Sequence, residues 1–273
     1  MTTIAHTLRS LLTQGLDRLD AQMLLLHALQ RPETDRAWLL VHDADALDDA
    51  ARIRLLSMAQ RRLGGEPLAY ITGHKEFFGL DLQVDARVLV PRPDTETLVE
   101  WALELAPVNV RVVDLGTGSG AIALALKHSR PDLDVTAIDF STDALAVAQA
   151  NARRLQLNVL FAQGSWLDGV GGRFDLIVSN PPYIANADHH LAALTHEPLQ
   201  ALASGADGLV DIRTIIRQAP AHLQPGGWLL LEHGYDQAAA VRALLADAGL
   251  QEAQSRRDLA GIERCSGARL PQP

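Results

Sequence analysis

From residue 110 onward, short apolar runs with strand character alternate with longer runs that have helical periodicity. Strands are expected at 110–115, 134–139, 159–162, 174–179 and 228–232, and a closing pair at 251–257 and 262–268. Because strand and helix alternate, this order predicts a parallel sheet with helices on both faces, and the closing pair is expected to be antiparallel. Ligands of such sheets bind beyond the carboxyl ends of the strands.

The turn after the first strand is the glycine-rich segment Gly116-Thr117-Gly118-Ser119-Gly120. Glycines permit a tight turn and let the backbone approach a ligand closely. Asp114 precedes the turn, where a carboxylate would repel a pyrophosphate but suits a cationic amino-acid group. Asp139 ends the next strand, where a carboxylate accepts hydrogen bonds from ribose hydroxyls. The Gly-x-Gly-x-Gly spacing departs from the dinucleotide fingerprint, so the pattern favours S-adenosylmethionine over NAD.

The fourth strand runs into Asn180-Pro181-Pro182-Tyr183. Prolines lack an N–H and hold the preceding residue extended, so this segment is stiff and presents the Asn180 side-chain oxygen and two carbonyls as acceptors. Such a site suits a substrate that donates two hydrogens from one planar nitrogen. A strand followed by an ordinary proline-rich turn is the alternative interpretation. The first and fourth strands are expected at the switch point of the sheet, so that the glycine turn faces Asn180 across one cleft.

Two other features allow both a functional and a structural interpretation. Trp166 follows the third strand and either lines an adenine pocket or belongs partly to the core. Pro91 and Pro93 hold Arg92 on a stiff loop, which is either a rigid linker between domains or a wall of the active-site mouth.

The pattern divides the chain into three parts. Residues 1–66 carry leucine stripes at helical spacing and predict a small bundle of three or four helices that could dock a partner. Residues 67–95 form a connector, in which aromatic and alternating apolar residues at 70–73 and 77–84 predict a β-hairpin. Residues 96–273 form the α/β domain.

Composition restricts the classes of function. The formal charge is −9, from 24 Lys and Arg against 33 Asp and Glu, which argues against a broad phosphate-binding face. Cys265 is the only cysteine, and the histidines are scattered, so neither a disulfide nor a metal site is expected. The first ten residues lack the apolar run of a signal peptide, and no apolar stretch approaches the ~18 residues of a membrane span. A cytoplasmic protein is therefore expected.

Several stretches together resemble the bacterial release-factor glutamine methyltransferases. These stretches are PLAYITG at 67–73, VPRPDTE at 90–96, DLGTGSG at 114–120, SNPPYI at 179–184 and Glu197-Pro198. The resemblance covers nearly the whole chain, although the Asn-Pro-Pro-Tyr motif is shared with adenine-amino DNA methyltransferases. It implies an α/β fold with the Rossmann-like sheet of class I S-adenosylmethionine-dependent methyltransferases, beside a small N-terminal helical bundle and a β-hairpin connector.

The resemblance also implies the ligands. S-adenosylmethionine, which leaves as S-adenosyl-L-homocysteine, would be bound by Gly116, Thr117, Gly118, Ser119, Gly120, Asp139, Trp166 and Asn180. The substrate would be the glutamine of the Gly-Gly-Gln loop in peptide chain release factors, held by Asn180, Pro181, Pro182 and Tyr183. Among these, Asn180, Pro181 and Tyr183 would act in catalysis by holding the amide nitrogen in line with the methyl group. A monomer without direct nucleic-acid or membrane contacts is expected.

Three other functions remain open from the sequence. An adenine-amino DNA or RNA methyltransferase would share the acceptor motif but needs a basic target-recognition region and a means of flipping a base. An NAD-dependent oxidoreductase would need a phosphate-compatible glycine loop, which Asp114 disfavours. A binding module that keeps the fold without catalysis is disfavoured by the intact acceptor motif.

Overall fold

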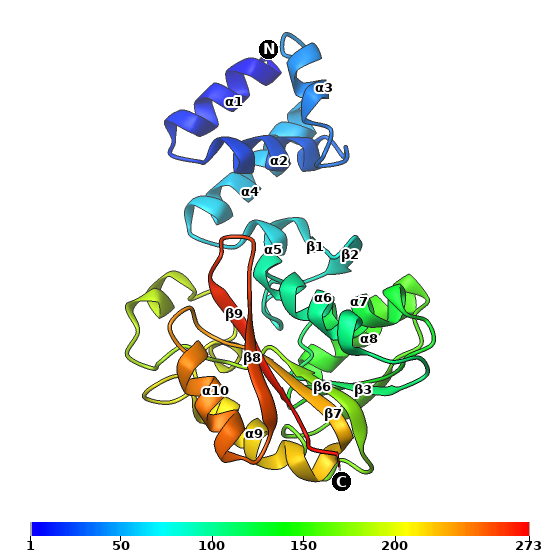
Figure 1. Ribbon diagram of the computed structural model, residues 1–273. Helices are drawn as coiled ribbons and strands as arrows, with labels where there is room; N and C mark the ends of the chain where they lie inside the picture. Colours follow the sequence, from blue (N-terminus) through cyan, green and yellow to red (C-terminus); the bar gives the residue numbers. More distant parts are fainter. Residues whose placement is uncertain (1, 273) are drawn as a thin grey trace. The chain divides into compact units, whose positions relative to one another are not determined.

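A computed structural model describes residues 2–272 of the chain, which divides into two compact units, Met1–His74 and Lys75–Pro273 (Figure 1). The terminal residues 1 and 273, which the sequence-based domain boundaries include, lie outside the described residues. Within residues 2–272, no helix is both long and apolar enough to cross a membrane.

The N-terminal unit is helical. Its helices are α1 (Ile4–Thr13), α2 (Arg18–Ala28), α3 (Arg36–Val41), α4 (Asp49–Leu63) and α5 (Leu68–Thr72). Asp17 caps α2 by accepting a 2.7 Å hydrogen bond from the N–H of Leu19, and Asp48 caps α4 in the same way. The leucine stripes meet in one core that contains Leu24 and Leu55. The predicted helical bundle is confirmed.

The predicted strand at 70–73 is wrong, because this segment forms α5. The helix begins directly after Pro67 and ends at Gly73, whose φ of +81° lies in the left-handed region. Tyr70 and Ile71 are buried on this short helix, so burial overrides their preference for strands. The two-stranded hairpin that follows consists of β1 (His74–Phe77) and β2 (Leu80–Gln83).

The larger unit is built on a sheet whose described strands run in the order β5-β4-β3-β6-β7-β9-β8. The strands are β3 (Arg111–Leu115), β4 (Asp134–Asp139), β5 (Leu160–Gln163), β6 (Phe174–Ser179), β7 (Leu223–Glu232), β8 (Gln251–Arg257) and β9 (Glu263–Arg269). Strands β3 to β7 run parallel to one another, whereas β9 is antiparallel to both of its neighbours, β7 and β8. The predicted parallel sheet with an antiparallel closing pair is confirmed.

Helices cover both faces of this sheet (Figure 1). They are α6 (Glu96–Leu105), α7 (Ala121–Ser129), α8 (Thr142–Leu155), α9 (Val210–His222) and α10 (Ala238–Asp247), with short 3₁₀ turns η1 (Pro93–Thr95), η2 (His189–Ala193) and η3 (Leu199–Ala201). Successive side chains of a strand point to opposite faces. Val112 therefore packs in the core that α6 and α7 complete, and Val113 packs in the core of α9 and α10.

The sheet topology brings the two sequence motifs together. β3 lies between β4 and β6, and Leu115, the last residue of β3, pairs with Ser179, the last residue of β6. The Ser179 hydroxyl donates a 2.7 Å hydrogen bond to the carbonyl of Leu115, which ties the two strand ends together. Gly116 and Asn180 consequently leave the sheet side by side, at the point where the strand order reverses.

Candidate active site at the carboxyl ends of the central strands

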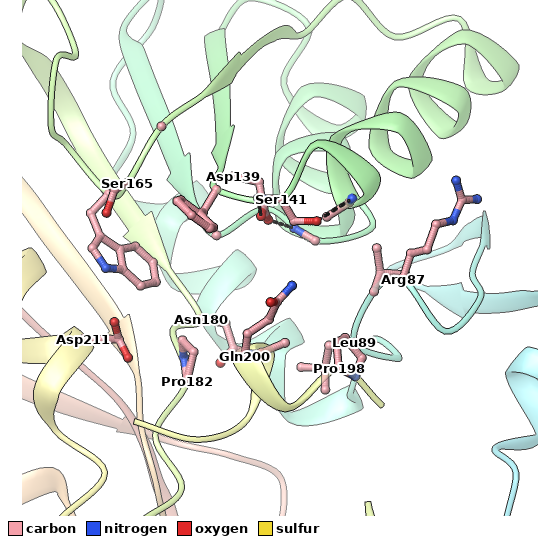
Figure 2. Close-up of a pocket in the computed structure, with 18 residues that line it drawn as sticks. Arg87, Leu89, Asp139, Ser141, Ser165, Asn180, Pro182, Pro198, Gln200 and Asp211 are labelled. Carbon is pink, nitrogen blue, oxygen red and sulfur yellow. Dashed lines mark hydrogen bonds between the residues drawn. The ribbon is translucent and has the colours of Figure 1, made fainter. Parts of the chain in front are cut away.

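A cavity of about 260 Å³ opens beyond the carboxyl ends of β3, β4 and β6 (Figure 2). Its lining from the strand ends and their turns comprises Gly116, Gly118, Asp139, Phe140, Ser141, Ala144, Gly164, Ser165, Trp166, Asn180 and Pro182. Other segments add Arg87, Val88, Leu89, Pro198, Gln200, Ala201 and Asp211. The structure thus brings together the glycine turn, Asp139, Trp166 and Asn180, as the sequence predicts.

Gly116 is required by both its conformation and its neighbour. Its φ of +70° lies in the left-handed region, and a Cβ at this position would lie 3.2 Å from Cζ3 of Trp166. The indole of Trp166 therefore packs against bare backbone at the edge of the cavity. This position supports the interpretation of Trp166 as a wall of the pocket.

Asp139 is oriented by the turns on either side of it. Its Oδ2 accepts a hydrogen bond from the N–H of Gly118, and its Oδ1 accepts one from the N–H of Ser141, both at 2.8 Å. Burial raises the pKa of Asp139 above its ordinary value, and these N–H groups oppose the rise. Because each carboxylate oxygen can accept a further hydrogen bond, Asp139 can receive two neighbouring hydroxyls from the cavity.

Thr117, Ser119 and Gly120 are absent from the described lining of the cavity, although the sequence places them in the site. The hydroxyl of Thr117 donates a 2.6 Å hydrogen bond to Oδ2 of Asp114, and the carbonyl of Ser119 accepts one from Asn151. The side chains of Thr117 and Asn151 therefore stabilise the turn from the side away from the cavity.

The expectation that Asp114 faces a cationic ligand group is wrong. Its carboxylate is fully buried beneath the turn and also accepts a hydrogen bond from the N–H of Ala123, at the start of α7. Burial raises the pKa of Asp114 to about 7, and the hydrogen bonds from Thr117 and Ala123 oppose the rise. Asp114 therefore fixes the strand-to-helix turn, and its carboxylate is not exposed to the cavity.

The side chain of Asn180 is held by a buried hydroxyl group that the sequence does not reveal. Its Nδ2 donates a 3.1 Å hydrogen bond to Oγ1 of Thr95, which is 5% exposed. Burial raises the pKa of Glu232 to about 7, and the nearby Thr95 hydroxyl, the charge of Arg264 and the hydrogen bond from Tyr183 oppose the rise. Because Nδ2 of Asn180 donates to Thr95, Oδ1 of Asn180 is left as the acceptor for a ligand.

A second cavity, of about 90 Å³, adjoins the first. Its described lining is Leu89, Arg92, Asn180, Tyr183, Ile184, Leu194, Ala201 and Leu202. Asn180 lines both cavities and therefore lies where they meet. The hydroxyl of Tyr183 donates a 3.3 Å hydrogen bond to Glu232, and burial raises the pKa of Tyr183, so this side chain is neutral at pH 7. Pro181 is buried and lines neither of these two cavities.

The loop around Arg92 forms a wall of the second cavity. This position supports its interpretation as a wall of the active-site mouth over that as a rigid linker. Glu197, 7% exposed, accepts a 3.1 Å hydrogen bond from the N–H of Val90 and pairs with the guanidinium of Arg92. This half-buried pair fastens the loop at 90–92 to the segment before η3. Glu232 was not identified from the sequence. It is the last residue of β7, and residues at the carboxyl ends of parallel strands commonly belong to the ligand site, so its position could have indicated a role in the active site.

The sheet order, the glycine turn after β3 and the carboxylate that ends β4 define a class I methyltransferase fold. Solved structures agree in fold. A methyltransferase from Pyrococcus furiosus superimposes with a TM-score of 0.56 at 19% identity, covering 81% of this chain and 98% of its own. A ribosomal protein L11 methylase from Lactobacillus delbrueckii gives a TM-score of 0.51 at 24% identity, covering 70% and 84%.

Sequence comparison defines the family. The model for the methyltransferase small domain matches residues 94–245, and the model for the PrmC N-terminal domain matches residues 3–73. A release factor glutamine methyltransferase from Bordetella pertussis is 51% identical over 94% of this chain and 96% of its own. One from Xylella fastidiosa is 49% identical over 95% of each. The chain belongs to the family of release factor glutamine methyltransferases, which confirms the resemblance found in its motifs.

Proposed function

We propose that this protein transfers a methyl group from S-adenosylmethionine to the side-chain nitrogen of the glutamine in the Gly-Gly-Gln loop of peptide chain release factors. The observation that carries the proposal is the position of Asn180 between two adjoining cavities. The larger cavity can take the donor and the smaller one an amide side chain. Relatives that share about half of its residues are named for this activity.

The residues of the larger cavity fit the donor. The free lone pairs of Asp139 suit the ribose hydroxyls, and the face of Trp166 beside Gly116 suits the adenine. Phe140, 72% exposed, adds a second aromatic ring to the lining directly after Asp139. When bound, S-adenosylmethionine supplies an electrophilic methyl group on a sulfonium sulfur and becomes S-adenosyl-L-homocysteine.

The smaller cavity fits the glutamine. Leu89, Ile184 and Leu202 offer apolar contacts for the methylene stem. Oδ1 of Asn180 would accept one hydrogen of the substrate amide. Pro181 itself lines neither cavity, but its carbonyl lies in the chain between the lining residues Asn180 and Pro182 and would accept the other hydrogen. Tyr183, at the same cavity, would pack against the amide plane.

Positioning accounts for the chemistry. A carboxamide nitrogen is a poor nucleophile, and none of the described residues that line the smaller cavity is a base at neutral pH. Two fixed acceptors hold the nitrogen in line with the methyl group and favour the positive charge that develops on it, an effect worth roughly 7–11 kcal/mol in favourable cases. As the C–N bond forms, the S–C bond breaks, and the nitrogen loses its extra proton afterwards, when it is acidic.

A monomeric enzyme remains part of the proposal. The substrate we propose acts in translation termination, so the reaction belongs in the cytoplasm. Neither cavity is lined by a cluster of Lys and Arg, in agreement with a protein acceptor.

Mass spectrometry of a release factor incubated with enzyme and S-adenosylmethionine tests the proposal. We expect one added methyl group on the Gly-Gly-Gln glutamine, and none on a release factor in which that glutamine is alanine. A filter assay with tritiated methyl groups compares release factor with DNA in parallel. Methylation of DNA, or of a different release-factor residue, would show that the acceptor is wrong.

A further inference from the structure

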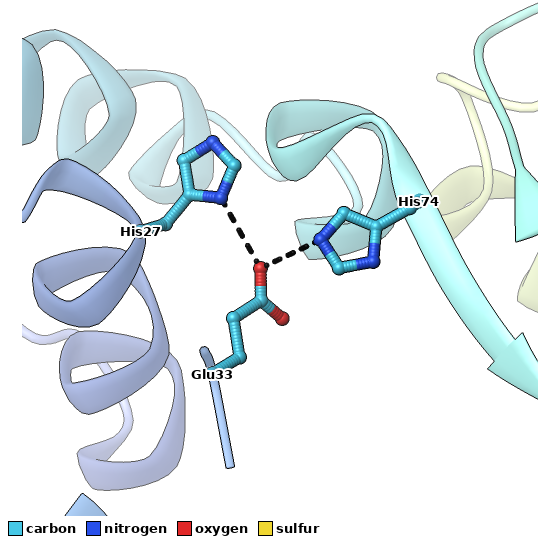
Figure 3. A group of neighbouring side chains, drawn as sticks. All are labelled: His27, Glu33 and His74. Atoms are coloured by element: carbon cyan, nitrogen blue, oxygen red, sulfur yellow. Dashed lines mark ion pairs between the residues drawn. The ribbon is translucent and has the colours of Figure 1, made fainter. Parts of the chain in front are cut away.

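Three side chains of the N-terminal unit converge on one place (Figure 3). His27 lies in the last turn of α2, Glu33 follows that helix, and His74 opens β1. Both imidazoles face the Glu33 carboxylate. Its Oε1 lies 3.3 Å from Nδ1 of His27 and 3.1 Å from Nε2 of His74. The three atoms all lie within 4.8 Å of one another.

Hydrogen bonding does not explain this cluster. Glu33 Oε1 is buried, and no hydrogen bond from a described residue reaches it. At these separations, an imidazole N–H directed at the oxygen would form a strong hydrogen bond. Both contacts are ion pairs when the histidines are protonated, but neither is a hydrogen bond, so a cation held between the three groups would give the buried oxygen the partner that it lacks.

We propose that His27, Glu33 and His74 bind Zn²⁺, with a water molecule as the fourth ligand. Zinc bonds to imidazole nitrogen and carboxylate oxygen are about 2.0–2.2 Å long, so a tetrahedral site holds neighbouring ligand atoms about 3.3 Å apart. The two nitrogen–oxygen separations of 3.3 and 3.1 Å agree with this spacing. Two histidines and one glutamate form a donor set that zinc enzymes use.

The surroundings suit an ion that enters from solvent. The side chains of His27 and His74 are 35% and 37% exposed, whereas Glu33 is 14% exposed. The ion would connect the end of α2 and the loop after it to His74, at the start of β1. The sequence does not indicate the site, because His74 lies 41 residues after Glu33 and the three ligands lack helical spacing.

A second cluster of the same residue types offers a matched control. Asp188, His189 and His190 also lie close enough to share an ion. Their histidines are exposed, and Oδ1 of Asp188 already accepts a hydrogen bond from the N–H of His190 and contacts its ring nitrogen at 2.7 Å. We therefore expect Zn²⁺ to prefer the first cluster.

Calorimetric titration of the chelator-treated, full-length protein with Zn²⁺ tests the proposal. We expect saturation at one Zn²⁺ per chain, and with Co²⁺ the visible absorption of a tetrahedral site. Glu33→Gln and, separately, His74→Gln should weaken Zn²⁺ binding at least about tenfold, whereas His189→Ala with His190→Ala should leave it unchanged. Zn²⁺ should also raise the Tm of the wild type and of the His189/His190 variant, but not that of Glu33→Gln.

Circular dichroism and methyl transfer by the metal-free variants show whether they remain folded. Absence of saturable binding to the wild type overturns the proposal without recourse to any variant. Wild-type affinity in both Glu33→Gln and His74→Gln would also overturn it. Loss of binding in the His189/His190 variant would move the site to the exposed cluster and have the same consequence. Failure of zinc binding leaves the proposed methyl transfer intact, because the two readouts are separate.

Discussion

Replacing Thr95 by valine tests whether one buried hydrogen bond controls the orientation of Asn180. Valine keeps the shape of threonine and removes the hydroxyl. In the structure, Nδ2 of Asn180 donates to Oγ1 of Thr95 at 3.1 Å, and Thr95 is 5% exposed, so water cannot easily take the place of the hydroxyl. The variant leaves the Asn180 amide free to turn over and to present its NH₂ to the substrate NH₂, an arrangement that cannot accept a hydrogen.

The expected size of the effect follows from the bond that is lost. A typical intramolecular hydrogen bond contributes about 0.5–1.5 kcal/mol, and about 1.4 kcal/mol corresponds to a factor of ten. The productive orientation of Asn180 should therefore lose about 2- to 13-fold in relative population, and the rate of methyl transfer should fall by that factor. Thr95 lines neither cavity, so the Kd for S-adenosylmethionine should stay unchanged.

Single-turnover transfer of a tritiated methyl group to a release factor measures this rate, and calorimetry measures donor binding. Thr95→Ser is the control, since it keeps the hydroxyl and removes only a methyl group. A Thr95→Val rate equal to that of the wild type would refute the role of this hydrogen bond. An equal loss in Thr95→Ser would also refute it, because packing and not the hydroxyl would then be responsible.

Three further outcomes are expected. Asn180→Ala should lower methyl transfer on the order of 10²-fold while calorimetry finds donor binding largely intact; near-normal turnover would remove the role of Asn180. Gly116→Ala should weaken the binding free energy of the donor by about 1–2 kcal/mol, which raises the donor Kd about 5- to 30-fold, because the new Cβ meets Trp166 at 3.2 Å and φ is +70°. Gly169→Ala is the control for backbone strain alone, since Gly169 has a φ of +73° and open space around it. Burial raises the pKa of Glu232 from 4.5 to about 7, so the folded state binds more protons than the unfolded state over this window. The free energy of unfolding should therefore fall by on the order of 3 kcal/mol from this group as the pH rises from about 4.5 to 7, and stay level above pH 7. Urea unfolding at several pH values should show that Glu232→Gln lacks this part of the pH dependence. An unchanged pH dependence in that variant would contradict the raised pKa.

Local patterns in the sequence were sufficient for much of the fold. The strands at 134–139 and 174–179 begin and end where β4 and β6 do, because apolar runs bounded by turn residues specify buried strands. At 70–73 the same reasoning failed. The strand preference of Tyr70 and Ile71 is weak beside the free energy of burying both on a short helix, and burial depends on which segments pack nearby.

The sequence by itself determined the parts of the site that depend on backbone chemistry. Glycines at 116 and 118 and prolines at 181 and 182 restrict the chain wherever it folds, so the glycine turn and the row of acceptors could be recognised without coordinates. Only the tertiary structure decided what surrounds them. The hydrogen bond from Asn180 to Thr95 joins two segments 85 residues apart, and the proposed zinc site joins the end of α2 and the loop after it to His74. Whether a side chain is buried, and which group it forms a hydrogen bond with, depends on the residues that pack against it. Packing brings these partners together from distant parts of the chain, so the order of residues does not reveal them.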